Sequence, residues 1–203
     1  MKKPLMQSVL QVPGALVGWF AIVLQFYLLI VNRTQPLGLT ILQFFSYFTI
    51  LTNISVAFYF SLQLFRPRDW PGAAVSTALA VYITIVGLIY NLVLRQLWSP
   101  QGWQRLVDEL LHTVVPLFFI GYWLLFFRRR LPWKSAFPWL IYPLAYLAFI
   151  LVRGAALHAY PYPFMDVTAL GYGRVALNSA ILCLVFLAFS FVFIGLSRIG
   201  RRS

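Results

Sequence analysis

The segment LQFFSYFTILTNISVAFYFSLQLF, from Leu42 to Phe65, is apolar and long enough to cross a lipid bilayer as a helix. Its first half contains a polar stripe of Ser46, Thr49, Thr52 and Asn53. Separations of three or four residues place these side chains on one face of a helix. Because hydrocarbon cannot form hydrogen bonds with them, we expect this face to point toward other helices or into a water-filled cavity.

The rest of the chain has the composition of an integral membrane protein. It has 203 residues, of which 62% are hydrophobic and 10% charged, and its mean hydropathy is +0.83. Apolar runs separated by short loops predict helical spans at about 12–31, 40–65, 73–95, 108–127, 136–155 and 172–197. We therefore predict an all-α integral membrane protein with one domain, residues 1–203, folded as a six-transmembrane-helix bundle.

The net charge of +12 is distributed in a way that indicates membrane orientation and argues against nucleic-acid binding. The segments expected on the inner side hold Lys2, Lys3, Arg66, Arg68, Arg128, Arg129, Arg130, Lys134, Arg198, Arg201 and Arg202. The outer side holds only Arg33, Arg95, Arg105, Arg153 and Arg174. Both termini are therefore predicted to be cytoplasmic, with membrane lipids as partners. Because Cys183 is the only cysteine, a disulfide framework within the chain is excluded.

The predicted fourth span, VDELLHTVVPLFFIGYWLLF, is the second informative stretch. Asp108 and Glu109 are expected in its first turn, where carboxylates favour the positive end of the helix dipole. His112 follows them by four and three residues, so the three side chains cluster on one side. Pro116 has no N–H, and the carbonyl that it leaves without a partner belongs to His112. We therefore expect the helix to open or kink at His112.

The outer ends of other spans hold further candidate residues. Asn91 lies near the end of the third span, four residues before Arg95. After the fifth span, the sequence AYPYPFMD cannot continue a helix because of its two prolines, and predicts a rigid outer loop that caps the bundle. The candidate cap residues are Arg153, Tyr160, Tyr162 and Asp166. Asp166 is expected to pair with Arg153 or Arg174, because an unpaired charge near the bilayer is costly.

Three motifs in this order, YFTILTN, HTVVP and YPYPF, resemble the androgen-inducible and androgen-dependent family of membrane hydrolases, and most closely its six-helix bacterial relatives. That family hydrolyses fatty acid esters of hydroxy fatty acids with a threonine and a histidine inside the membrane. The resemblance implies Thr49 as the nucleophile, His112 as its catalytic partner, no cofactor and no metal. It also implies a lipid ester as substrate and a location in the bacterial inner membrane.

The residues support this chemistry independently. A threonine hydroxyl is a weak nucleophile until a base removes its proton, and a histidine suits that task. Asp108, Glu109 or Asn91 could orient the imidazole, while Ser46, Thr52 or Asn53 could support the site or donate to an oxyanion. We expect the pocket to open toward the outer leaflet between the second, third, fourth and sixth spans. The lipid tail is expected along Phe44, Phe45, Phe48 and Phe118.

Two other functions stay open from the sequence. Glu109 and His112 have the Glu-x-x-His spacing of some metal sites, with His158 and Asp166 on the same predicted side. A transporter or small-ligand receptor could also line its path with the polar stripe. The chain has no obvious inverted repeat, and its polar groups are expected to crowd toward the outer half, which argues against transport.

Overall fold

The computed structural model describes residues 5–65, 71–126 and 129–199, and these residues are helical apart from short connections. Six helical segments are long and apolar enough to cross a membrane, namely Met6–Val31, Phe48–Phe65, Ala73–Leu97, Gly102–Phe126, Trp133–Leu157 and Val167–Arg198. The all-helical class and the six apolar helices are therefore confirmed. Of the basic residues used to predict orientation, Lys2, Lys3, Arg66, Arg68, Arg128, Arg201 and Arg202 lie outside the described residues.

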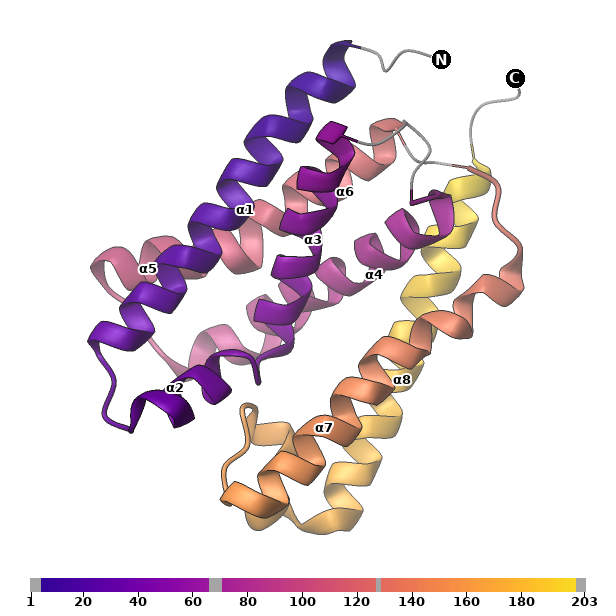
Figure 1. The fold of residues 1–203 in the computed structure, drawn as a ribbon. Helices are drawn as coiled ribbons and strands as arrows, with labels where there is room; N and C mark the ends of the chain where they lie inside the picture. Colours follow the sequence, from indigo (N-terminus) through magenta and orange to yellow (C-terminus); the bar gives the residue numbers. More distant parts are fainter. Residues whose placement is uncertain (1–4, 66–70, 127–128, 200–203) are drawn as a thin grey trace.

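The helices alternate in direction along the bundle (Figure 1). The α-helices are α1 (Leu5–Val31), α2 (Leu37–Phe44), α3 (Phe48–Phe65), α4 (Ala73–Ile89), α5 (Gly102–Glu109), α6 (Val115–Phe126), α7 (Ile141–Leu157) and α8 (Val167–Arg198). Shorter turns are η1 (Tyr90–Leu94), η2 (Arg95–Leu97), η3 (Leu110–Val114), η4 (Trp133–Ala136), η5 (Pro138–Leu140) and η6 (Pro163–Met165). The start of α1 and the end of α8 lie at one end of the bundle, and α2 lies at the other (Figure 1).

The second predicted span, 40–65, is not one continuous helix. α2 ends at Phe44 and α3 begins at Phe48, so Ser46 lies in the turn between them. Ser46 Oγ donates to the carbonyl oxygen four residues back, and the Tyr146 hydroxyl donates to the Ser46 carbonyl oxygen at 2.8 Å. A side chain from α7 thus satisfies a carbonyl that a continuous helix would bond internally. The expectation that Ser46 shares a helical face with the other stripe residues is therefore wrong.

The fourth span begins earlier than predicted and changes geometry in its middle. Asp108 and Glu109 lie in the last turn of α5, so the expected stabilisation at a helix N-terminus does not apply. Leu110–Val114 then forms a π-helical turn. Pro116 accounts for this turn, because its missing N–H leaves the His112 carbonyl without a helical partner. The opening that the sequence predicts at His112 is confirmed.

Aromatic rings join the second, fifth and sixth spans. The ring of Phe48, at the start of α3, lies 5.0 Å from Tyr142 and 5.1 Å from Tyr146 between centroids. It also lies 5.8 Å from the ring of Phe186 on α8. Rings at these separations add favourable edge contacts to the burial of apolar area. They fix α7 and α8 against the break between α2 and α3.

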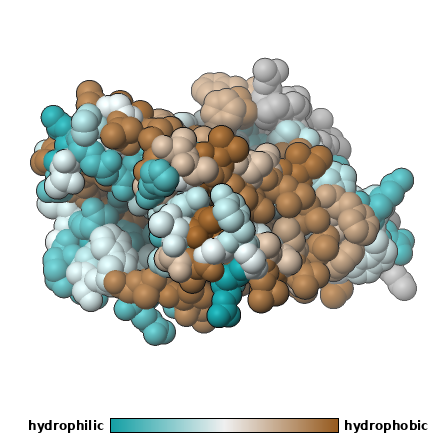
Figure 2. Space-filling view, turned by 90° about the horizontal axis from the view of Figure 1, so that it is seen from below, coloured by the Kyte–Doolittle hydropathy of each residue, from teal (hydrophilic) through white to brown (hydrophobic). Residues whose placement is uncertain are grey.

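The outer surface of the bundle is largely apolar, as lipid requires. On α1, for example, Leu16 is 66% exposed and Val23 is 62% exposed. Figure 2 views the molecule from the end at which α2 lies, and hydrophilic residues gather toward one side while hydrophobic residues cover much of the rest. Such apolar surface over the helix flanks fits a lipid environment.

A group of buried residues with polar atoms lies in the half of the bundle where α1 begins. This glutamine cluster comprises Gln7, Gln11, Thr77, Tyr122 and Trp123. Gln11 Nε2 donates to the Tyr122 hydroxyl at 2.8 Å, and Trp123 Nε1 donates to Thr77 Oγ1 at 2.9 Å. The expectation that buried polar groups crowd into the outer half is therefore wrong. Helices α1, α4 and α6 use these groups to hold each other together.

Candidate active site

A cavity of about 420 Å³, here called the wide cavity, lies in the half of the bundle where α1 ends and α3 begins. Its polar lining residues are Gln25, Tyr47, Thr49, Tyr90, Trp98, Gln104, Asp108, His112 and Tyr162. The fold thus brings Thr49 and His112, the pair named from the sequence, to the same cavity. The first span and the loop before α8 contribute to its lining, whereas α8, expected in the wall, does not.

Bonding to Asp108 fixes the imidazole of His112. His112 Nδ1 lies 2.9 Å from the backbone carbonyl oxygen of Asp108 and 3.3 Å from its carboxylate Oδ1. A carbonyl oxygen only accepts, so Nδ1 carries the proton in the neutral ring and Nε2 keeps a free lone pair. Within the described part of the chain, no residue forms a hydrogen bond with Nε2. His112 is thereby prepared to accept a proton from a group in the cavity.

Tyr90 contacts both His112 and Asp108. Its ring stacks on the imidazole of His112, with centroids 3.6 Å apart and an interplanar angle of 11°. Its hydroxyl donates to Asp108 Oδ2 and accepts from Trp98 Nε1, which lies 3.1 Å away. Tyr90 was not predicted as a site residue, because a tyrosine near the end of a span is typical of an interfacial aromatic belt. Its position directly before Asn91 was the available signal.

Thr49 differs from several other hydroxyl residues in the helices. Ser55, Ser61 and Thr84 each donate to the carbonyl oxygen four residues back, at 2.8, 2.9 and 2.6 Å. Thr49 makes no such bond within the described residues. The residue four positions earlier, Phe45, lies in the break between α2 and α3, so the helical geometry that this bond needs is lost. The break therefore keeps the Thr49 hydroxyl from being committed to its own backbone.

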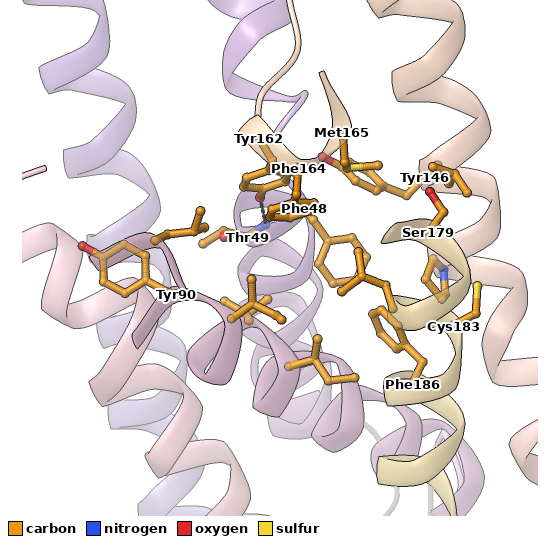
Figure 3. Close-up of a pocket in the computed structure, with 17 residues that line it drawn as sticks. Phe48, Thr49, Tyr90, Tyr146, Tyr162, Phe164, Met165, Ser179, Cys183 and Phe186 are labelled. Carbon is orange, nitrogen blue, oxygen red and sulfur yellow. Dashed lines mark hydrogen bonds between the residues drawn. The ribbon is translucent and has the colours of Figure 1, made fainter. Parts of the chain in front are cut away.

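Tyr162, from the loop before α8, covers Thr49. Its hydroxyl accepts the backbone N–H of Thr49 at 3.4 Å (Figure 3). Burial raises the pKa of the Tyr162 hydroxyl above its ordinary value, and the nearby side chain and N–H of Thr49 lower it in part. The phenol is therefore neutral near pH 7 and retains a proton that it can donate.

Asn53 and Asn91 hold the π-helical turn that carries His112. Asn53 Nδ2 donates to the carbonyl oxygens of Thr49 and Leu111, at 2.9 and 3.2 Å. Asn91 Nδ2 donates to a carbonyl of its own helix and to the carbonyl oxygen of His112 at 3.3 Å. Both amides thus bind carbonyls that the π-helical turn leaves free. This leaves neither N–H₂ group for an oxyanion or for the imidazole, which were the roles considered from sequence.

The remaining predicted support residues have partners elsewhere. The carboxylate of Glu109 pairs with Arg95 and accepts from the Thr113 hydroxyl at 3.0 Å. Thr52 Oγ1 lies 3.1 Å from the Tyr142 hydroxyl on α7. The wide cavity is lined by none of Ser46, Thr52, Asn53, Asn91 and Glu109. Of the three candidates for orienting His112, the structure places only Asp108 against the ring nitrogen.

The predicted cap residues have separate places in the loop and at the end of α7. The ring of Tyr160 packs directly on Gly154, where a Cβ would clash with it. Arg153 Nη1 donates to a loop carbonyl at 2.9 Å. Asp166 caps the N-terminus of α8 by accepting two backbone N–H groups, at 2.9 and 3.1 Å. Among the described residues it forms no ion pair with Arg153 or Arg174, so the pairing expected from sequence is wrong.

The residues proposed for a metal site do not converge. Across residues 5–65, 71–126 and 129–199, no group of three or more His, Cys, Asp or Glu side chains could hold a metal ion. His158 is the C-cap of α7, in a left-handed conformation with φ of 50°. Glu109 is occupied by Arg95. Glu109 and His112 are therefore neighbours along the chain that bind different partners, and their Glu-x-x-His spacing is not that of a metal site.

A second and narrower space, here called the narrow cavity, measures about 80 Å³ and lies between α3, α4, α7 and α8 (Figure 3). Of the four phenylalanines expected along a lipid tail, Phe48 lines it and Phe44 lines the wide cavity. Phe45 is 43% exposed, and Phe118 packs against Phe60 with ring centroids 5.7 Å apart. Neither of these last two lines either cavity, so the expected tail path is wrong in part.

Around the wide cavity, a hydroxyl, an imidazole held by a carboxylate and a neutral phenol are assembled from two helical spans and the loop before α8. Groups of these types can carry out acyl transfer. Comparisons with protein-family models, with curated proteins and with solved structures found no match for this chain.

Proposed function

We propose that this protein is an intramembrane hydrolase of lipid carboxylic esters, with Thr49 as nucleophile and His112 as general base. One observation carries the proposal: Thr49 and His112 come from different helices and line the same cavity, with His112 Nδ1 bonded to the buried Asp108. A nucleophile and an oriented base at one cavity define a functional arrangement irrespective of sequence order. The motifs around both residues, FTIL and HTVVP, add the resemblance to membrane threonine hydrolases.

In the first step, Thr49 Oγ1 attacks the ester carbonyl carbon while His112 Nε2 takes the hydroxyl proton. The buried carboxylate of Asp108 stabilises the resulting imidazolium. The tetrahedral intermediate then collapses, the bond to the alcohol oxygen breaks, and His112 returns the proton to that oxygen. An alcohol leaves, and the acyl group stays on Thr49 as an ester.

In the second step, water attacks the acyl-threonine. His112 takes a proton from the water and returns it to Thr49 Oγ1 as the tetrahedral intermediate collapses, which breaks the bond between Thr49 Oγ1 and the acyl carbon and releases a carboxylic acid. Thr49 lies in the first turn of α3, where backbone N–H groups lack partners within the helix. The Thr49 N–H donates to the Tyr162 hydroxyl, so that hydroxyl and the positive end of the helix dipole are the proposed stabilisers of the oxyanion.

A hydroxyl-reactive fluorophosphonate probe tests the pair directly. Wild-type protein in detergent should be labelled at Thr49, as located by peptide mass spectrometry, and Thr49→Ala should abolish the labelling. His112→Ala should slow it by about 10²-fold or more, the usual contribution of a general base.

Two variants serve as matched controls. Thr84→Ala removes another membrane threonine that donates to its own helix and lines neither cavity. His158→Asn removes the only other histidine and keeps a residue that tolerates the left-handed conformation at that position. Both should be labelled at the wild-type rate. Labelling that persists in folded Thr49→Ala at an unchanged rate would refute the assignment of the nucleophile.

A further inference from the structure

The narrow cavity offers hydrocarbon and almost no free polar group. Its walls include Ile85, Val86, Leu147, Leu182 and Phe186. Its polar residues on α7 and α8, Tyr146 and Ser179, already form hydrogen bonds. The Tyr146 hydroxyl donates to the Ser46 carbonyl oxygen at 2.8 Å, and Ser179 Oγ donates to the carbonyl four residues back at 2.8 Å. An occupant therefore gains by burying apolar surface, and a polar occupant would lose its hydrogen bonds to water.

The two cavities share part of their lining, including Thr49. Four residues, Thr49, Tyr90, Leu94 and Tyr162, line both of them. His112 and Asp108 line only the wide cavity, whereas Ser179 and Cys183 of α8 line only the narrow one. Figure 3 shows the labelled Thr49 and Tyr90 on one side of the narrow cavity and Ser179, Cys183 and Phe186 on the other.

Reaction chemistry decides which half of an ester belongs in which cavity. The base that takes the Thr49 proton returns it to the leaving alcohol oxygen, so the alcohol lies on the His112 side. The acyl chain starts at the carbonyl carbon that Thr49 attacks and extends away from the leaving group. We propose that the narrow cavity is the acyl-chain compartment, which accepts an unbranched fatty acyl chain, and that the wide cavity holds the alcohol part of the substrate. The orientation rests on the proposed hydrolase function.

The cavity dimensions agree with this division. The wide cavity, at about 420 Å³, is lined by two amides and three phenols that suit a bulky alcohol with polar groups. The narrow cavity, at about 80 Å³, suits a slender chain. A longer acyl chain contacts more apolar wall than a short one and gains more from burial. Preference for long acyl chains is therefore assigned to the α8 side of the site.

Cys183 allows a test of binding that does not depend on turnover, because it is the only cysteine in the chain and lines the narrow cavity. The rate of its alkylation by N-ethylmaleimide is measured by intact mass, with hexadecanoic acid or butanoic acid present. At concentrations well above its dissociation constant, hexadecanoic acid should slow alkylation at least about tenfold, while butanoic acid at the same concentration should not. The protection should be equal in wild type and Thr49→Ala.

A relocated thiol controls for general shielding by lipid. In Cys183→Ser/Leu184→Cys, the thiol stands at the next position of α8, where the native side chain is 65% exposed on the outer surface. Its alkylation should not respond to hexadecanoic acid. Equal protection at both positions, or no protection at Cys183, would overturn the compartment assignment.

Turnover of nitrophenyl esters of graded acyl length then tests specificity. Ser179→Leu should narrow the compartment and lower kcat/KM for the hexadecanoyl ester at least about tenfold relative to the butanoyl ester, since buried chain length sets binding. Ile181→Phe, a change on the exposed side of α8, should leave this ratio unchanged. Protection of Cys183 without turnover of any ester would support the compartment and refute the hydrolase. Turnover without protection of Cys183 would support the hydrolase and refute the acyl-chain compartment.

Discussion

Two regions of this protein bury polar side chains inside a membrane bundle, and they differ in kind. The glutamine cluster is neutral and joins α1, α4 and α6 through side-chain bonds such as those from Gln11 to Tyr122 and from Trp123 to Thr77. The site around Thr49 contains a carboxyl group and an imidazole, from Asp108 and His112. Both cavities reach Thr49, and neither is lined by a residue of the glutamine cluster.

The difference shows that a buried polar group is a poor indicator of function on its own. In the glutamine cluster, hydroxyl and indole groups bond to one another, and their contribution is helix association. At the candidate site, the same kinds of bonds hold His112 and Asp108 in place but leave Nε2 and the Thr49 hydroxyl facing a cavity. Substitutions around Thr49 should therefore change turnover, and substitutions in the glutamine cluster should change stability.

The largest effect is expected at the nucleophile. Thr49→Ala should lower ester turnover by at least about 10³-fold, because the attacking oxygen is removed and only binding and electrostatic terms are left. Thr49→Ser should retain measurable turnover, since the hydroxyl is kept. Steady-state kinetics on a nitrophenyl ester, with the melting temperature measured alongside, would check both variants. Turnover by Thr49→Ala close to that of wild type would remove the main distinction between the two regions.

A smaller loss is expected when the support of His112 is weakened. Asp108→Asn should lower kcat by about 10²-fold, less than the roughly 10⁴-fold seen when a serine triad loses its carboxylate. The reason is that the backbone carbonyl of Asp108 still accepts from Nδ1 and preserves the tautomer. Glu109→Gln, which changes the neighbouring carboxylate bound to Arg95, should have a much weaker effect on kcat. Equal losses in the two variants would contradict a specific role for Asp108.

Tyr162→Phe removes the hydroxyl that covers Thr49 and should reduce turnover about tenfold or less, because the helix dipole is left in place and the Thr49 N–H is released from its bond to Tyr162. Since burial raises the pKa of Tyr162, its phenol keeps its proton to higher pH than an exposed tyrosine would. The ratio of wild-type to Tyr162→Phe turnover should therefore be constant between about pH 7 and about pH 10, where a free tyrosine would ionise. A ratio that falls toward unity within this range would show that Tyr162 ionises early.

The smallest effect is expected in the glutamine cluster, and it concerns stability. Thr77→Val leaves Trp123 Nε1 without its acceptor and should destabilise the fold by about 1 kcal/mol, as is typical of interhelical bonds in membranes. Turnover per folded molecule should not change. Thr84→Val, which removes a hydroxyl bonded only to its own helix, should cost less. Thermal unfolding in detergent, followed by kinetics on the folded fraction, measures both quantities.

The sequence by itself determined the helical class, the six apolar spans and the opening at His112. These features follow from local rules: lipid demands helices of a certain length, and Pro116 removes one N–H at a known position. The same rules marked the polar stripe and His112 as groups that lipid cannot satisfy, and the family resemblance selected Thr49 within that stripe. Local rules act within one helix, so they do not depend on which helices become neighbours.

Only the tertiary structure decided the break before Thr49, the roles of Asn53 and Asn91, and the stacking of Tyr90 on His112. In each case the partner lies far along the chain. The Tyr146 hydroxyl from α7 binds the Ser46 carbonyl, and Asn53 from α3 binds a carbonyl of the π-helical turn. A polar side chain in lipid must find a partner, but its sequence does not say which helix supplies one. Packing makes that choice, and it separates the residues that hold the site from those that face it.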